Sequence, residues 1–90
     1  MTAVAANQIR VSVISPERTI FEGGADMVVA PAWDGEIGIL RGHAPTLVLL
    51  GSGNLRVSDG TQTRQFHVSG GFMQVADDVV TILSEQASEG

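Results

Sequence analysis

Turn-forming residues interrupt this chain about every 6 to 12 residues, and no segment between them has the 3.6-residue apolar period of a buried helix. The intervening segments are short and apolar, and some alternate in polarity, as Ile9, Val11 and Val13 do with their polar neighbours. This spacing predicts about eight to ten short strands. Because a single sheet would leave an apolar face in water, we predict an all-β fold, a two-sheet antiparallel β-sandwich.

Turn signals divide the chain further. Pro16 favours a type I turn over residues 15–18. Asp59-Gly60, between two alternating segments, predicts a two-residue hairpin loop, and Asp77-Asp78 a second turn. We expect a flexible N-terminus over residues 1–7, a sandwich domain over 8–84 and a polar C-terminal tail over 85–90, which could also start a helix.

The charge balance excludes several classes of partner. The chain has five basic residues, all arginine, against ten acidic ones, and a net charge of −5. Scattered arginines cannot form the basic stripe that nucleic acids require, and an anionic membrane surface would repel the chain. No segment approaches the ~20 apolar residues of a membrane span, and no secretory signal is visible, so a soluble cytoplasmic protein is the default expectation.

The inventory of reactive groups is small. Cysteine, lysine and tyrosine are all absent, and no strand–G-x-S-x-G–helix elbow is present, so we expect no catalytic residues. His43 lies near Asp34 and Glu36 in sequence, but without a metal-binding spacing such as HxH or HExxH, and we expect it to brace its loop rather than bind a metal. The glycine-rich turns lack Gly-Lys-Ser/Thr, so no nucleotide or other cofactor is expected.

Three segments are apolar at nearly every position, which would cover both faces of a strand. They are residues Met27–Ala30, Thr46–Leu50 and Val79–Leu83. In so small a protein not every such face can be internal, so we expect some of this surface to pack on another subunit.

Four segments resemble the epsilon subunit of bacterial F-type ATP synthase. They are V-I-S-P-E-R-T-I-F-E-G (13–23), G-E-I-G-I-L-R-G-H-A-P (35–45), F-H-V-S-G-G-F (66–72) and V-T-I-L (80–83). Each match is weak alone, but the four occur in the family's order across most of the chain. On this basis the chain is identified as a member of that family.

The resemblance implies a non-catalytic subunit of the rotor, at the cytoplasmic face of the bacterial inner membrane. Such a subunit joins the gamma subunit of the central stalk to the membrane c-ring and couples proton translocation to ATP synthesis. Asp34, Gly35 and Glu36 match the loop that faces the c-ring, whose own loops carry an arginine in this family, so the charges are complementary.

Six further positions carry expectations from the same resemblance. Those expected near the gamma subunit are Ser15, His43 and Val48. Those expected to shape the loop are Gly38, Gly42 and Pro45. The family's usual C-terminal helical hairpin, which binds ATP in some members, has no counterpart in the 90 residues, so neither hairpin nor ATP binding is expected here.

Two other functions stay open on the residues alone. A free-standing β-sandwich that binds a small ligand or carbohydrate would need stacking aromatic residues, and the chain offers Trp33 and three phenylalanines. Burial of Trp33 would count against this alternative. A histidine-dependent hydrolase or metalloprotein would depend on His43.

Overall fold

The computed structural model describes residues 4–90, which form ten strands and no helix. No membrane-spanning helix is therefore found in this part of the chain. In chain order the strands are β1 (Ile9–Ile14), β2 (Thr19–Ala25), β3 (Met27–Ala32), β4 (Gly35–Leu40), β5 (Thr46–Leu49), β6 (Ser52–Ser58), β7 (Thr63–Ser69), β8 (Phe72–Ala76), β9 (Val79–Leu83) and β10 (Gln86–Glu89).

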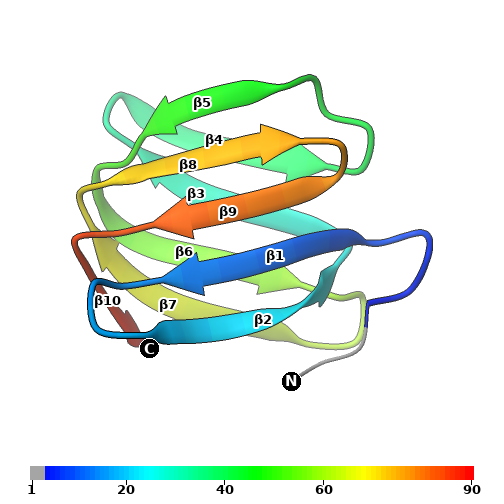
Figure 1. The fold of residues 1–90 in the computed structure, drawn as a ribbon, viewed down its shortest axis with the longest axis horizontal. Helices are drawn as coiled ribbons and strands as arrows, with labels where there is room; N and C mark the ends of the chain where they lie inside the picture. The colour runs from blue at the N-terminus through cyan, green and yellow to red at the C-terminus, as the bar shows by residue number, and fades with distance from the viewer. Residues whose placement is uncertain (1–3) are drawn as a thin grey trace.

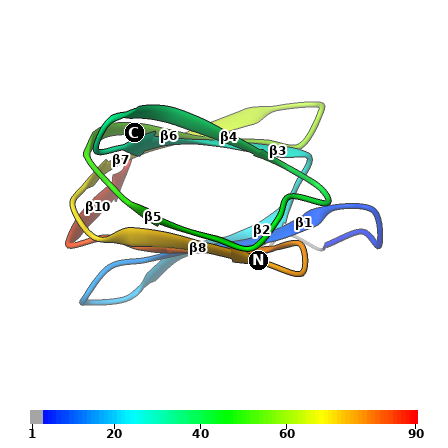
Figure 2. The ribbon, with the colours of Figure 1, turned by 90° about the horizontal axis from the view of Figure 1, so that it is seen from above.

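The strands form two five-stranded sheets packed face to face. Sheet A has the order β2-β1-β9-β8-β5, and sheet B the order β10-β7-β6-β3-β4. Figure 1 looks onto the outer face of sheet A with sheet B behind it, and Figure 2 shows the two layers from above. The predicted β-sandwich is confirmed.

One strand pair departs from the expected antiparallel arrangement. β1 and β9 pair in parallel, from Arg10 opposite Val79 to Ile14 opposite Leu83, whereas the other pairs among the described strands are antiparallel. Parallel neighbours need a long crossover connection, and here the seven intervening strands supply it. Local turn signals carry no information about such a pair.

Alternating residues of both sheets fill the core. Val11 and Ile82 of sheet A and Leu55 and Phe66 of sheet B are among the fully buried side chains. Each such burial contributes about 1.5–3 kcal/mol relative to exposure. The rings of Phe21 and Phe66 lie 5.5 Å apart between their centroids and pack the two sheets together near β2.

The two long sides of the sandwich are built differently. Along the β2–β10 side, the Arg64 guanidinium lies 5.4 Å from the centroid of the Phe21 ring and 3.1 Å from Glu89 Oε2, so one side chain joins both sheets. On the opposite side, β5 of sheet A and β4 of sheet B are the facing edges (Figure 2). There the Trp33 N–H donates to the Leu49 carbonyl at 3.0 Å, close to where the chain leaves β3.

The polar C-terminal segment is a strand, so the prediction of a tail or a helix start was wrong. β10 pairs with β7 in antiparallel register, from Gln86 opposite Ser69 to Glu89 opposite Phe66. Its sequence is polar because β10 is an edge strand, in which Ala87 alone packs against the core. Edge pairing of this kind depends on backbone hydrogen bonds more than on apolar alternation.

At the N-terminus, residues 1–3 of the segment predicted to be flexible lie outside the described residues. Residues 4–7 contain a turn, in which the Gln8 N–H donates to the Ala5 carbonyl at 3.0 Å and the Ala5 N–H donates to Gln8 Oε1 at 3.1 Å. Flexibility of this segment stays a prediction.

The prediction of a two-residue hairpin loop at Asp59-Gly60 was wrong. Ser58 pairs with Thr63, so the connection at Asp59-Gly60 has four residues, and Gly60 is its one position with positive φ, at 90°. Asp77-Asp78 is a two-residue hairpin loop, and both of its residues have positive φ, 53° and 60°. Aspartate tolerates this left-handed conformation better than most residues, which lets Asp-Asp replace the usual Asp-Gly.

Candidate docking surfaces

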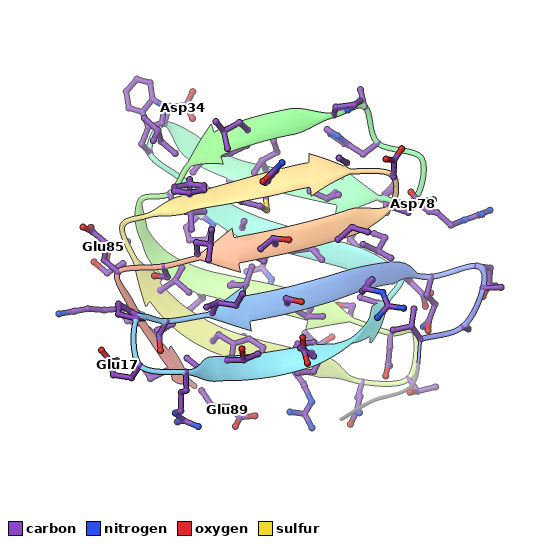
Figure 3. The ribbon with its side chains drawn as sticks, viewed as in Figure 1. Glu17, Asp34, Asp78, Glu85 and Glu89 are labelled. Atoms are coloured by element: carbon purple, nitrogen blue, oxygen red, sulfur yellow. The ribbon has the colours of Figure 1, made fainter. Side chains whose placement is uncertain are left out.

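The predicted ring-facing residues lie on an exposed hairpin turn. Ala32 pairs with Gly35, so Trp33 and Asp34 form the two-residue connection between β3 and β4. Figure 3 shows Asp34 at a corner of the molecule, beyond the end of β5. The Trp33 side chain is 71% exposed, and Asp34, Gly35 and Glu36 are exposed as well.

Glu36 has one charged neighbour on this surface. Its Oε2 lies 3.5 Å from Arg56 Nη1, and both side chains are substantially exposed. The ion pair spans the outer face of sheet B, because Arg56 of β6 lies opposite Val29 of β3, which lies opposite Gly38 of β4. Exposed pairs of this type contribute about 0–1 kcal/mol, so Glu36 can exchange this partner at low cost.

A groove lies beside this turn, between the edges of the two sheets. It has a volume of about 570 Å³ and is lined on one wall by residues 32–37 and on the other by Leu47, Val48 and Leu49. Its walls combine an indole, two carboxylates and aliphatic side chains. Such a surface suits a partner segment that carries both apolar and cationic groups.

The loop around His43 is fixed by local hydrogen bonds. The Gly42 N–H donates to Asp78 Oδ1 at 2.6 Å, which ties this loop to the turn between β8 and β9. His43 Nδ1 lies 2.8 Å from the Ala44 carbonyl oxygen, and Thr46 Oγ1 donates to the same oxygen at 2.8 Å. His43 is half-buried and braces its loop, and no group of three or more potential metal ligands occurs among residues 4–90.

The three residues predicted to shape this loop differ in position. Gly42 has a φ of 83°, a left-handed conformation that favours glycine. Pro45 lies in the loop before β5 and lines a hollow of about 440 Å³ with Phe72. Gly38 is not in a loop: it lies within β4, where open space surrounds the position of a Cβ atom.

The three residues predicted to face the gamma subunit are separated. Ser15 is 6% exposed and sits in the turn between β1 and β2, where its hydroxyl donates to the Arg18 carbonyl at 3.1 Å. This turn and the β4–β5 loop that contains His43 lie at opposite ends of the sandwich (Figure 1). Val48 is half-buried and its side chain packs against the core.

The exposed residues of β5 were missed by sequence reasoning. Leu47 and Leu49, on either side of Val48, are 70% and 63% exposed. Because residues 46–50 are almost uniformly apolar, the sequence gives no sign of which alternate positions face the core. Only the pairing of β5 with β8 sets this parity, with Val48 opposite the buried Met73.

An apolar row crosses the outer face of sheet A. It consists of Ile14, Leu83, Phe72 and Leu49, which are opposite one another in successive strand pairs. It runs from the end of β1 to the edge strand β5, across the face seen in Figure 1. One end of the row therefore adjoins Ser15.

The outer face of sheet B has a different character. Asn54, His67 and Ser88 form a polar row over β6, β7 and β10, and the exposed Met27 and Leu40 lie opposite each other on β3 and β4. The outer face of sheet A carries the larger set of exposed apolar side chains, which are Leu47, Leu49, Phe72 and Val79. Of the two faces, that of sheet A is therefore the better candidate for a protein contact.

Comparison with known proteins identifies the family. Residues 8–90 match the model of the ATP synthase delta/epsilon chain β-sandwich domain. The chain belongs to this family. It is 42% identical over 82 residues to the ATP synthase epsilon chain of Caulobacter vibrioides, covering 91% of this chain and 95% of that one. With the epsilon chain of Acidithiobacillus ferridurans the identity is 46% over 82 residues, covering 91% and 58%.

Solved structures agree with this assignment. A chain in the mitochondrial ATP synthase of Euglena gracilis, determined with OSCP, F1 and the c-ring, superposes with a TM-score of 0.85 at 29% identity, covering 96% of this chain and 55% of that one. A chain of the Tetrahymena thermophila central stalk and c-ring shares the fold, with a TM-score of 0.71 at 17% identity, covering 88% and 64%. The chain thus spans little more than half of some epsilon-family proteins and nearly all of others.

The family match decides between the functions that the sequence left open. Relatives that are ATP synthase epsilon chains confirm the prediction of an ATP synthase subunit that is not itself an enzyme. Burial of Trp33 would have argued against a free-standing ligand-binding module, but Trp33 is exposed, so its position does not exclude that function. The similarity to ATP synthase epsilon chains is what favours the ATP synthase subunit over the ligand-binding module.

Proposed function

We propose that this epsilon-family chain works in the rotor of an F-type ATP synthase, at the cytoplasmic face of the bacterial inner membrane. There it joins the gamma subunit to the c-ring and couples proton translocation to ATP synthesis. The chain performs no chemistry, and its task is to hold two partners at once. The observation that carries the proposal is the apolar row of sheet A, half-buried at Ile14 and Leu83 and exposed at Phe72 and Leu49, on a chain that belongs to the epsilon family.

The gamma subunit contacts the apolar row and the exposed side of β5. Ser15 lies next to Ile14 at one end of the row, and Val48 lies between the exposed Leu47 and Leu49 at the other. His43 precedes β5 and extends the same surface toward the opposite end of the strand. Ser15 and Val48, expected near gamma from the resemblance, thus adjoin the two ends of the apolar row, and His43 lies at the far end of β5.

Burial of this surface would supply the affinity. Each Å² of apolar surface removed from water contributes about 25 cal/mol, and a stable interface needs on the order of 1,000 Å² or more. Leu47 and Leu49 are the most exposed aliphatic residues of sheet A, so they have the most surface to bury. Phe72 adds an aromatic side chain beside Leu49.

The c-ring contacts the turn at Asp34, Gly35 and Glu36. The exposed carboxylates of Asp34 and Glu36 complement the arginine that ring loops carry in this family, and complementary charge sets register and orientation more than affinity. A close-packed sandwich between the two contacts deforms little, so torque applied at one surface reaches the other.

Co-elution with the gamma subunit of the same organism in size-exclusion chromatography tests the proposal. A one-to-one complex is expected, and Leu49→Asp is expected to weaken it at least about tenfold, because an interface core does not accept an unpaired charge. Leu40→Asp is the matched control, because Leu40 is 59% exposed, against 63% for Leu49, and projects from sheet B. Wild-type affinity in Leu49→Asp, or equal losses in both variants, would contradict the proposed gamma surface.

A further inference from the structure

Trp33 has no packing role that accounts for its position. It is the one tryptophan of the chain, and its side chain is 71% exposed on a two-residue turn. Its backbone is nonetheless fixed, because the Trp33 N–H donates to the Leu49 carbonyl at 3.0 Å. A large aromatic side chain is thus held in water at a defined place.

Two carboxylates share a groove with this aromatic ring. Trp33, Asp34 and Glu36 line the same groove of about 570 Å³, a volume typical of a ligand site. Of the two carboxylates, Glu36 has Arg56 at 3.5 Å from one oxygen, and Asp34 takes part in no ion pair within residues 4–90. Unsatisfied negative charge therefore remains at the groove.

An indole beside two carboxylates favours a guanidinium group over an ammonium group. A planar guanidinium can stack on an indole face and donate paired hydrogen bonds to a carboxylate, whereas an ammonium is a compact, strongly hydrated charge that does neither as well.

We propose that Trp33, Asp34 and Glu36 form an arginine-selective docking site, in which the partner's guanidinium stacks on Trp33 while its N–H groups bond the carboxylates. The partner is a protein loop that presents an arginine, and the inference rests on the proposed function, in which this turn meets the polar loops of the c-ring. Beyond that function, it assigns Trp33 a role and predicts discrimination between arginine and lysine.

The single tryptophan makes the test direct. The chain is labelled with 5-fluorotryptophan, which gives one ¹⁹F resonance from Trp33, and is assembled with unlabelled gamma subunit. The complex is titrated with detergent-solubilised c-rings that have arginine, lysine or glutamine at the cationic position of the polar loop. We expect the ¹⁹F resonance to shift most with the arginine ring, and the dissociation constant to rise about threefold with lysine and further with glutamine.

Variants of this chain separate stacking from simple charge attraction. Trp33→Leu is expected to bind the arginine and lysine rings equally, while Trp33→Phe keeps part of the preference. Leu40→Ala removes a comparably exposed apolar side chain from another surface and should leave the preference intact.

The outcomes distinguish the inference from the proposed function. If the rings bind but the ¹⁹F resonance does not move, or Trp33→Leu still prefers arginine, the docking site is wrong and the ring contact stands. If no ring binds the wild-type complex, the ring contact itself is wrong and the inference falls with it.

Discussion

The hydroxyl of Ser84 lies 3.2 Å from the amide nitrogen of Ser69 and 3.3 Å from its carbonyl oxygen. The same hydroxyl lies 3.2 Å from the Gly70 carbonyl oxygen and 2.6 Å from that of Gln86. Ser84 connects β9 to β10, and Ser69 ends β7. One buried side chain therefore joins two of the places where the chain passes between sheets A and B, the β7–β8 and β9–β10 connections.

We expect Ser84→Ala to lower the free energy of unfolding by about 1–3 kcal/mol, because it leaves buried backbone groups without their partner. Ser84 is only 4% exposed, so water cannot replace the hydroxyl without rearrangement. Urea denaturation followed by circular dichroism measures the change. Ser88→Ala, at an exposed position of β10, is the control and should change stability by less than about 0.5 kcal/mol.

Glycine is required at position 71 for two reasons. Its φ is 95°, and a Cβ atom there would collide with the carbonyl oxygen of Leu83 and approach the Cα of Ser84 to 2.8 Å. We expect Gly71→Ala to destabilise the fold by more than about 3 kcal/mol, or to prevent folding, since both obstacles are backbone atoms.

Gly38→Ala is the contrasting substitution, because β4 leaves open space at that position. Thermal denaturation of the two variants should place Gly38→Ala within about 1 kcal/mol of wild type. Comparable loss in both variants would mean that Gly38 has a structural role that its surroundings do not reveal.

Asp59 makes the stability depend on pH. Its Oδ1 accepts hydrogen bonds from the backbone N–H groups of Gln62 and Thr61 and from the Thr61 hydroxyl. These bonds lower the pKa of Asp59 below its ordinary value of 3.8, with the Gln62 N–H as the largest cause. A depressed folded-state pKa adds stability above the unfolded-state value, and this stability is lost as the pH falls through the folded-state pKa.

We therefore expect Asp59→Asn to be less stable than wild type at pH 7, with the difference shrinking as the pH falls below 3.8. Asparagine keeps an oxygen acceptor but loses the charge, so the comparison isolates the ionisation. Urea midpoints across the pH range measure it. A difference that is constant with pH would show that the charge of Asp59 does not contribute.

The sequence predicts the sandwich because alternation and turn residues are local signals. It does not predict the β1–β9 pair or β10, because both depend on partners far away in the chain. In the candidate site too, local features can be predicted from the sequence and features set by long-range strand pairing cannot. The acidic turn at Asp34 is visible from its residues, whereas the exposure of Leu49 depends on the pairing of β5 with β8.

Glu36→Arg tests the ring contact in the assembled enzyme. The substitution places a positive charge opposite the arginine of the ring loop, so we expect a several-fold fall in proton-driven ATP synthesis by membrane vesicles. The fold should tolerate it, because the Glu36–Arg56 pair is exposed and contributes at most about 1 kcal/mol. Glu22→Arg, which makes the same charge change on β2, is the control. Synthesis at the wild-type rate in Glu36→Arg would show that Glu36 does not contact the ring, because reversing a charge at the centre of that contact should weaken it.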